Sequence, residues 1–257
     1  MTQNERLNYL LTYLLNERGL SCAQIPASPH EQRHLLRALM NLREPSPAGD
    51  EFIRVQNEYL HEEINKKGIT YADSLPFVSD KLCLWQGDIT TLACDAIVNA
   101  ANSAMLGCFV PCHGCIDNAI HTFAGVQLRM ECSEIMKKQG CPEPTGKANL
   151  TSAYCLPCKY ILHTVGPVAL PELTDEHCAM LAECYRSCLS LAEKFGLHSI
   201  AFCCISTGEF RFPNQRAAEI AVSAVKSYLK NSSIERVIFN VYKDIDREIY
   251  RRLLSGN

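Results

Sequence analysis

Long apolar runs, an excess of one charge and an export signal are all missing from this sequence of 257 residues. A membrane-spanning helix needs about 20 mostly apolar residues in a row, and no stretch approaches that length. The formal net charge is −3, with Lys and Arg scattered along the chain, whereas nucleic-acid-binding domains carry a basic stripe. The first residues, MTQNERLNYLL, lack the apolar segment of a signal peptide. We therefore expect no membrane span and no nucleic-acid partner.

Cysteine, by contrast, is abundant, with 15 residues in the chain. An odd number of cysteines without an export signal favours free thiols in a reducing compartment, so we expect a cytoplasmic protein. Cys155 and Cys158 form a CxxC pair, but the pair falls in a predicted strand and not at a helix N-terminus, where a thiol would be activated. We interpret this pair as packing, and Cys203 and Cys204 as part of a core strand.

Residues 1–80 have the pattern of a helical N-terminal extension. Leucines recur at helical spacing in the first segment, which Gly19 ends. Ser28, Pro29 and Glu31 then give the capping-box pattern of a helix start. A third helix is predicted from residue 50 to about 67. We expect this extension to dock on the rest of the chain.

From residue 81 onward, apolar strand patterns alternate with helical ones, which indicates a three-layer α/β domain over residues 81–257 with a largely parallel central mixed sheet. The predicted strands are 82–85, 96–98, 160–165, 200–205 and 237–241. The predicted helices are 121–140, 175–195, 214–229 and 244–254.

A polar loop follows the second of these strands and is rich in metal-binding side chains. Cys108, Cys112, His113 and Cys115 lie within eight positions. Zinc favours sulfur and nitrogen ligands, and a site with three protein ligands leaves a position for water or substrate. The spacing alone leaves a second possibility open, because free Cys also packs as a small apolar residue.

Five ordered segments of the chain resemble the macrodomain family, and specifically its zinc-containing branch, which removes ADP-ribose from proteins. They run from about Trp85 to the C-terminus and read GDIT (87–90), VNAAN (98–102), GKANLTSAY (146–154), KYILHTVGP (159–167) and ISTG (205–208). The Cys/His loop stands between the second and third segments. The resemblance implies the three-layer macrodomain fold, preceded by the helical extension.

The resemblance also implies a site for ADP-ribose. Asp88 would accept a hydrogen bond from the adenine amine, although an Asp at this point also commonly caps a turn; Ile89 would offer its backbone amide nearby. Asn99 and Asn102 suit the hydroxyls of the distal ribose. The loop after the 200–205 strand would bind the phosphates through backbone amides, and consists of Ser206, Thr207, Gly208, Glu209 and Phe210.

The implied reaction is zinc-dependent hydrolysis that removes mono-ADP-ribose from modified proteins at an Asp or Glu ester and releases ADP-ribose. Cys108, His113 and Cys115 would hold Zn²⁺, which would either activate a water or orient the ribose hydroxyls. Asp117 and Asn102 are the expected catalytic residues, and Cys112 is a possible fourth ligand. Two alternatives stay open: a reader that binds ADP-ribose without turnover, and a deacetylase of O-acetyl-ADP-ribose. We expect His121 to pack inside a helix.

Overall fold

Three helices form the N-terminal extension in the computed structural model, which describes residues 1–255, apart from the side chain of Gln24. They are α1 (Gln3–Glu17), α2 (Pro29–Leu42) and α3 (Asp50–Lys67), with a short 3₁₀ turn η1 (Cys22–Gln24) after α1. The predicted helical character and the limits of the third helix are confirmed. The predicted capping box is not, because the Ser28 side chain makes no cap hydrogen bond, although Pro29 does stand in the first turn. The last two residues of the predicted 81–257 domain lie outside the described residues, and the boundary at residue 80 stays a prediction.

A seven-stranded sheet in the order β2-β3-β9-β8-β5-β7-β6 forms the centre of the remaining chain. Its five inner strands are parallel, and the two edge strands are antiparallel to their neighbours. The predicted α/β class with a largely parallel mixed sheet is therefore confirmed. The strands are β2 (Phe77–Ser79), β3 (Leu82–Gln86), β5 (Ala96–Ala101), β6 (Ala148–Ser152), β7 (Tyr160–Val165), β8 (Ser199–Phe202) and β9 (Arg236–Val241), beside a separate parallel pair β1 (Thr70–Tyr71) and β4 (Leu92–Ala93).

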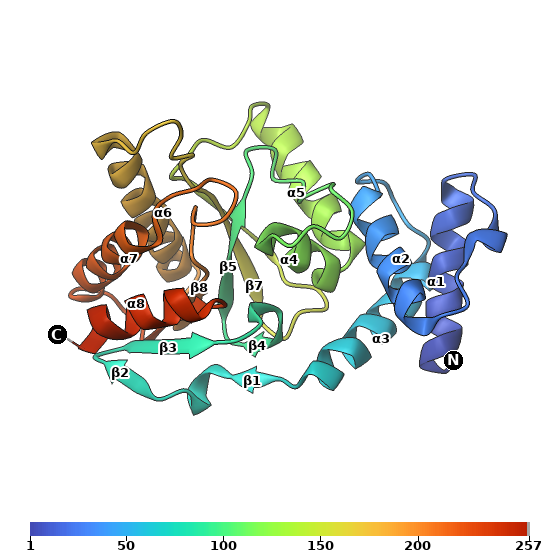
Figure 1. Cartoon of the computed structure of the whole chain (residues 1–257), viewed down its shortest axis with the longest axis horizontal. Helices are drawn as coiled ribbons and strands as arrows, with labels where there is room; N and C mark the ends of the chain where they lie inside the picture. Colours follow the sequence, from blue (N-terminus) through green and yellow to red (C-terminus); the bar gives the residue numbers. More distant parts are fainter. Residues whose placement is uncertain (256–257) are drawn as a thin grey trace.

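Helices cover the sheet on both sides, with α4 and α5 on one side and α6, α7 and α8 on the other (Figure 1). The 3₁₀ turns η2 and η3 lie before β2 and after β3. The bounds are α4 (Ile116–Ala124), α5 (Val126–Gln139), α6 (Asp175–Lys194), α7 (Asn214–Leu229), α8 (Asp244–Ser255), η2 (Ala72–Ser74) and η3 (Ile89–Thr91). These layers leave the loops after β3, β5 and β8 at the carboxyl edge of the parallel strands, where open α/β sheets bind ligands.

Gly125 divides the predicted helix 121–140 into α4 and α5. Its φ is +95°, in the left-handed region that glycine adopts without strain. The Gln56 amide also packs so closely that an added Cβ would lie 2.6 Å from Nε2. A backbone reversal of this kind leaves little trace in an apolar pattern, which explains why the sequence suggested one helix.

The predicted positions of four cysteines need correction. The CxxC pair Cys155 and Cys158 lies in a turn before β7 and not in a strand. Cys203 and Cys204 follow the end of β8. Burial raises the pKa of Cys155 and of Cys158 to about 12, so neither thiol has the activated character of a redox centre. All 15 cysteines are free, as predicted.

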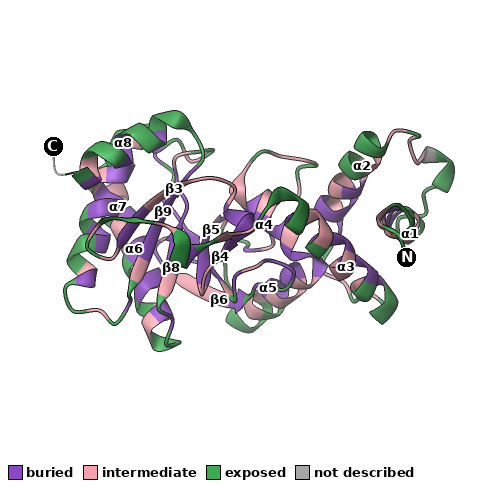
Figure 2. Cartoon of the chain, turned by 90° about the horizontal axis from the view of Figure 1, so that it is seen from below, coloured by how far each residue is buried: buried purple, intermediate pink, exposed green. Residues whose placement is uncertain are grey.

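The buried apolar side chains form two clusters, one around the sheet and one among α1, α2 and α3. The second cluster also takes in Val126 and Cys155 from the α/β part, and Figure 2 shows α2 and α3 beside α4 and α5. Polar contacts seal this junction: the buried Arg129 guanidinium donates to the carbonyl oxygens of Met40, Asn41 and Arg43. None of the helices in residues 1–255 is both long enough and apolar enough to cross a membrane.

Candidate active site

Asp117 lies in the first turn of α4 and is held by two asparagine side chains. The Asn99 amide nitrogen donates to Asp117 Oδ1 at 2.8 Å, and the Asn102 amide nitrogen to Oδ2 at 3.2 Å. Only 4% of Asp117 is exposed. Burial raises the pKa of its carboxyl to about 6, against the lowering effect of the Asn99 hydrogen bond. The carboxylate is therefore fixed in position by one donor within β5 and one from the residue that follows this strand.

Asn99 is completely buried, at 0% exposure, and its predicted contact with the ribose hydroxyls stays a prediction. Its amide nitrogen lies 3.1 Å from His163 Nδ1 as well as bonding Asp117. Because an amide nitrogen only donates, His163 Nδ1 must accept, which leaves the proton on Nε2 facing Thr151 Oγ1 at 2.9 Å. These hydrogen bonds from Thr151 through His163 fix the orientation of the Asn99 amide, and Asn99 in turn holds Asp117 in position.

Asn102 has a different setting from Asn99, since it is partly exposed at the start of the loop. Besides Asp117, its amide nitrogen donates to the Gly107 carbonyl at 3.1 Å, and its Oδ1 accepts from the Ala104 amide at 3.0 Å. Asn102 therefore both shapes the loop and borders Asp117.

Three predicted metal ligands come together in the loop before α4. The ligand atoms of Cys108, His113 and Cys115 all lie within 4.8 Å of one another, and the three residues are half-buried. His113 Nδ1 is buried without a hydrogen-bond partner. Burial raises the pKa of Cys115 to about 12, and the neighbouring Cys108 adds to the shift. A bound cation would reverse that shift by attracting the thiolates, so the donor set and the vacant imidazole nitrogen fit zinc.

Cys112 points away from this group. Its thiol donates to the His34 carbonyl at 3.4 Å, and its backbone amide donates to Asn41 Oδ1 at 2.9 Å. Both partners belong to α2. Cys112 therefore ties the loop to the N-terminal helices, and among the described residues it is not grouped with the three donors.

A second donor group lies in the interior behind Asp117 and consists of His121, Cys132 and His163, all buried. The prediction that His121 packs inside a helix is confirmed: its ring lies against Gly107, where an added Cβ would meet it at 2.7 Å. Burial lowers the pKa of His121 well below its usual range. The 3.6 Å approach of its Nε2 to Asp117 Oδ1 is therefore a contact of a neutral ring.

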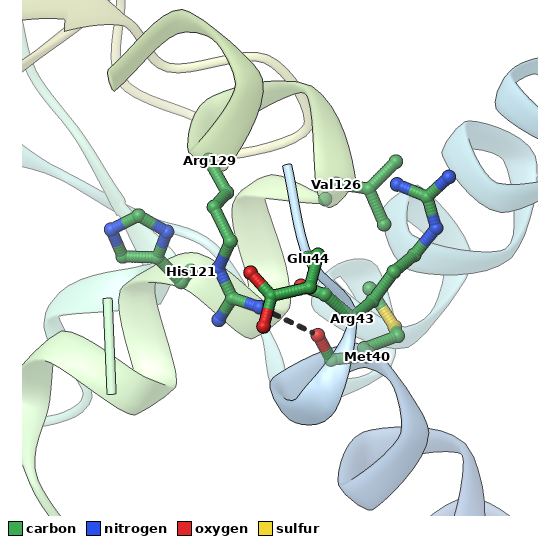
Figure 3. Close-up of a pocket in the computed structure, with 7 residues that line it drawn as sticks. Met40, Arg43, Glu44, His121, Val126 and Arg129 are labelled. Atoms are coloured by element: carbon green, nitrogen blue, oxygen red, sulfur yellow. Dashed lines mark hydrogen bonds between the residues drawn. The ribbon is translucent and has the colours of Figure 1, made fainter. Parts of the chain in front are cut away.

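A small cavity adjoins His121 between α2, α4 and α5, and Figure 3 shows Arg129 and Glu44 beside it. Its volume is about 10 Å³, which corresponds to about one water molecule. The cavity is far too small for a nucleotide.

The loop after β8 has the backbone of an anion-binding turn. Ser206 adopts a φ of +64°, and the amides of Gly208, Glu209 and Phe210 donate to no other described residue. Gly166 permits this shape, because an added Cβ would come within 2.0 Å of Ser206 Oγ. Thr207 closes the turn through its hydroxyl, which donates to the Cys204 carbonyl at 3.0 Å. Successive unpaired amides of this kind form concave sites for phosphate.

The loop after β8 and the metal loop face each other. Glu209 Oε1 lies 3.6 Å from His113 Nε2, with the Glu209 side chain 73% exposed. Since Asp117 follows the metal loop directly, this contact brings the predicted phosphate loop, the three metal donors and Asp117 to one place.

Asp88 performs the structural role that was its alternative interpretation. It begins η3, and its Oδ1 accepts from the amide of Thr90 at 3.0 Å and from the Thr90 hydroxyl at 2.6 Å. Its Oδ2 pairs with Lys67 Nζ at 2.9 Å, and 39% of the Asp88 side chain is exposed. The side chain of Ile89 is buried. Contact of both residues with adenine stays a prediction.

Sequence reasoning missed the residues that the N-terminal helices bring to the site. Arg37 of α2 donates to the His113 carbonyl at 3.0 Å and to Asn118 Oδ1 at 2.8 Å. Lys67 of α3 reaches Asp88. No local motif marks such pairs, because they join positions far apart in the chain. His163 did carry a signal, as a lone polar ring within an apolar strand.

Comparison with known proteins settles the family. A model of the Macro domain matches residues 98–221. The chain is 54% identical over 261 residues to a protein of Treponema medium named protein-ADP-ribose hydrolase, and the match covers 99% of this chain and 100% of the relative. The chain belongs to the macrodomain family.

Other macrodomain proteins agree with this assignment. A protein of Staphylococcus aureus strain MSSA476, also named protein-ADP-ribose hydrolase, is 47% identical over 97% of this chain and 95% of its own. The macrodomain of Trypanosoma brucei, solved in complex with ADP-ribose, matches with a TM-score of 0.66 at 30% identity, covering 89% of this chain and 97% of that one. The macrodomain of Oceanobacillus iheyensis with ADP gives 0.65 at 35% identity, covering 71% and 94%. The family predicted from the motifs is confirmed, while its zinc-containing branch stays a prediction.

Proposed function

We propose that this macrodomain is a protein-ADP-ribose hydrolase that binds mono-ADP-ribosylated proteins and releases ADP-ribose by a zinc-dependent reaction. The observation that carries the proposal is the placement of Asp117: a buried carboxylate, oriented by two amides, directly after a loop with three metal donors and across from a turn of unpaired backbone amides. Binding alone does not require a fixed, desolvated carboxylate, whereas acid–base chemistry does.

Each part of the cleft has a binding role in this proposal. The amides of Gly208, Glu209 and Phe210 donate to the phosphates of ADP-ribose, and Ser206 and Thr207 shape their turn. Asp88 and Ile89 hold the adenine. Asn102 lies beside Asp117, and its Oδ1, which also accepts from the Ala104 amide, accepts a hydrogen bond from a hydroxyl of the distal ribose.

Asp117 performs the proton transfer. The bond cleaved is the ester that joins C1″ of the distal ribose to an Asp or Glu side chain. The Asp117 carboxylate accepts a proton from the attacking water, and the products are ADP-ribose and the restored acidic side chain. Asn99, backed by His163, keeps the carboxylate in position, so that no reorganisation is needed as the bond breaks.

Cys108, His113 and Cys115 would hold the zinc ion. His113 would bind it through Nδ1, the ring nitrogen that has no hydrogen-bond partner. Glu209 faces the other ring nitrogen and would fix the ring, as carboxylates do behind many metal-bound histidines. When bound, zinc supplies Lewis acidity and a fixed point for ribose hydroxyls or water.

The test is incubation of the whole protein with proteins that carry mono-ADP-ribose on Glu, Ser or Arg, with chromatography of the released nucleotide. We expect free ADP-ribose from the Glu-linked protein. Binding of ADP-ribose without release from any of the three would contradict the proposal and favour the reader.

A further inference from the structure

A basic groove lies between α2, α3 and the end of α4, apart from the cleft described above. Its volume is about 390 Å³. Six of its 13 lining residues are of basic type, namely His30, Arg33, His34, Arg37, Lys66 and Lys67, and Glu63 is the single acidic one. In a chain with a net charge of −3, this is a local concentration of positive charge.

The outer cations of the groove are uncommitted. Arg33 and His34 are exposed, and their side chains bond to no other described residue. Arg37 donates only to neutral oxygens, those of Asn118 and the His113 carbonyl. Lys66 and Lys67 pair with carboxylates. A ligand with carboxylates would therefore meet two guanidinium groups, those of Arg33 and Arg37, that have no anionic partner among the described residues. The exposed His34 ring lies next to them in the sequence as a further hydrogen-bonding group.

The floor of the groove is apolar and exposes no aromatic face on which a nucleic-acid base could stack. Leu36, Met40, Tyr59 and Leu60 line it and are buried. The Phe123 ring is covered by Lys67, whose Nζ lies 3.3 Å from the ring centroid. Single-stranded nucleic acids bind through exposed aromatic faces, and this floor offers none. An acidic peptide with apolar side chains would match both parts of the groove, its carboxylates the basic residues at the edge and its apolar side chains the floor.

The groove borders the proposed cleft at two points. At one end, Arg37 contacts the backbone of the metal loop at His113. At the other, Lys67 pairs with Asp88. A protein whose ADP-ribose lies in the cleft is attached at the distal ribose, next to the metal loop. Its chain would therefore leave the site close to Arg37.

We propose that this groove binds an acidic segment of the substrate protein, on the N-terminal side or the C-terminal side of the modified residue. The idea that the segment belongs to a substrate rests on the proposed function. Its acidic character is argued from the unpaired guanidinium groups of the groove, because the modified carboxyl itself is a neutral ester. The N-terminal helices thus select the protein, while the cleft recognises the nucleotide.

The first test measures binding without catalysis. The probe is a fluorescein-labelled 12-residue peptide of Glu and Leu, compared with the same peptide with Gln for Glu, in fluorescence anisotropy. The variant R33E/H34E replaces two exposed basic residues that line the groove with acidic ones. The control variant R54E/H61E makes the same replacements at exposed positions of α3 outside the groove. We expect R33E/H34E to weaken binding of the Glu peptide about tenfold, with the loss shrinking at high salt, and R54E/H61E to match wild type.

The second test measures turnover of a mono-ADP-ribosylated protein modified within a Glu-rich segment. R33E/H34E should raise KM several-fold and leave kcat and the affinity for free ADP-ribose unchanged, because no substituted residue belongs to the cleft. Equal binding of the Glu peptide by R33E/H34E and wild type would overturn the proposal, as would preference for an oligothymidine over the peptide. If no turnover occurs at all, the proposed function fails, while the peptide measurement still decides the groove.

Discussion

Two groups of nitrogen and sulfur donors lie close together in this protein, and their surroundings differ. Cys108, His113 and Cys115 share one half-buried loop, where His113 Nδ1 has no partner. His121, Cys132 and His163 come from α4, α5 and β7 and are buried. Both ring nitrogens of His163 already contact Asn99 and Thr151. Both ring nitrogens of His121, by contrast, are buried without a hydrogen-bond partner. The two groups therefore differ mainly in burial: the donors of the loop are half-buried, whereas the second group is enclosed in the interior, where His163 supports Asn99 and, through it, Asp117.

The first prediction separates the two groups by metal content. We expect about one zinc per chain in protein purified without added metal, and none in the double variant C108A/H113A. C112A, from the same loop, and C132A, from the buried group, should both keep zinc, because the Cys112 thiol faces α2 and we expect the zinc at the half-buried loop and not at the enclosed Cys132. Elemental analysis gives the answer, and zinc retained by C108A/H113A would refute the loop assignment.

The second prediction concerns the carboxylate between the two groups. Asp117→Ala should slow the release of ADP-ribose by about 10²–10⁴-fold, the usual contribution of an acid–base group. Its affinity for free ADP-ribose should fall by only about 1 kcal/mol, the worth of one hydrogen bond. Single-turnover kinetics and calorimetry measure the two losses, with Asp80→Ala as an exposed control. A rate that falls only in proportion to affinity would assign Asp117 to binding alone.

The third prediction tests the adenine end. Asp88→Ala should weaken binding of ADP-ribose by roughly 1–3 kcal/mol, the cost of leaving a buried polar partner unpaired. Thr90→Val removes the hydroxyl that donates to Asp88 Oδ1 but keeps the backbone amide of the cap and the carboxylate, so its affinity should stay close to wild type. If calorimetry finds the same affinity for ADP-ribose in Asp88→Ala as in wild type, Asp88 has only a structural role, as the cap of its turn and the partner of Lys67.

The fourth prediction tests the buried group through pH. Burial lowers the pKa of His163 to about 3, so below its ordinary value of about 6.5 the unfolded chain takes up the proton first. The free energy of unfolding should therefore decrease as the pH is lowered. His163 alone should account for a loss of about 1 kcal/mol between pH 6.5 and pH 5.5. Urea titrations should show that loss in wild type and in the exposed-site control His61→Gln. A His163→Gln variant with the same pH slope would contradict the neutral ring.

The sequence predicted those parts of the fold that follow from local patterns. The third helix, the strand at β7 and the helix α7 have the predicted limits, because strong periodicity and clear end signals coincide there. The break at Gly125 was missed because the apolar pattern continues through it. The Gln56 side chain of α3, which accepts from the Val126 amide at the start of α5, is far away in the sequence. The motifs likewise predicted which loops border the site, and the structure brings Glu209 and His113 together.

The parts of the site that depend on packing could not be predicted. Nothing local distinguishes Asn99 from Asn102, yet one is fully buried behind Asp117 and the other borders the loop. The thiol of Cys112 is chemically the same as those of Cys108 and Cys115, and its direction is decided by α2. The roles of Arg37 and Lys67 arise only once the N-terminal helices are packed against the α/β part.

The most direct test of the central claim is release of ADP-ribose from a Glu-linked mono-ADP-ribosylated protein by one preparation in three states: as purified, after removal of metal by a chelator and dialysis, and after addition of about one equivalent of zinc. Calorimetry with free ADP-ribose is run on each state. The account predicts that release is lost without metal and restored by zinc, with ADP-ribose bound in all three. Equal release in the first two states would contradict it.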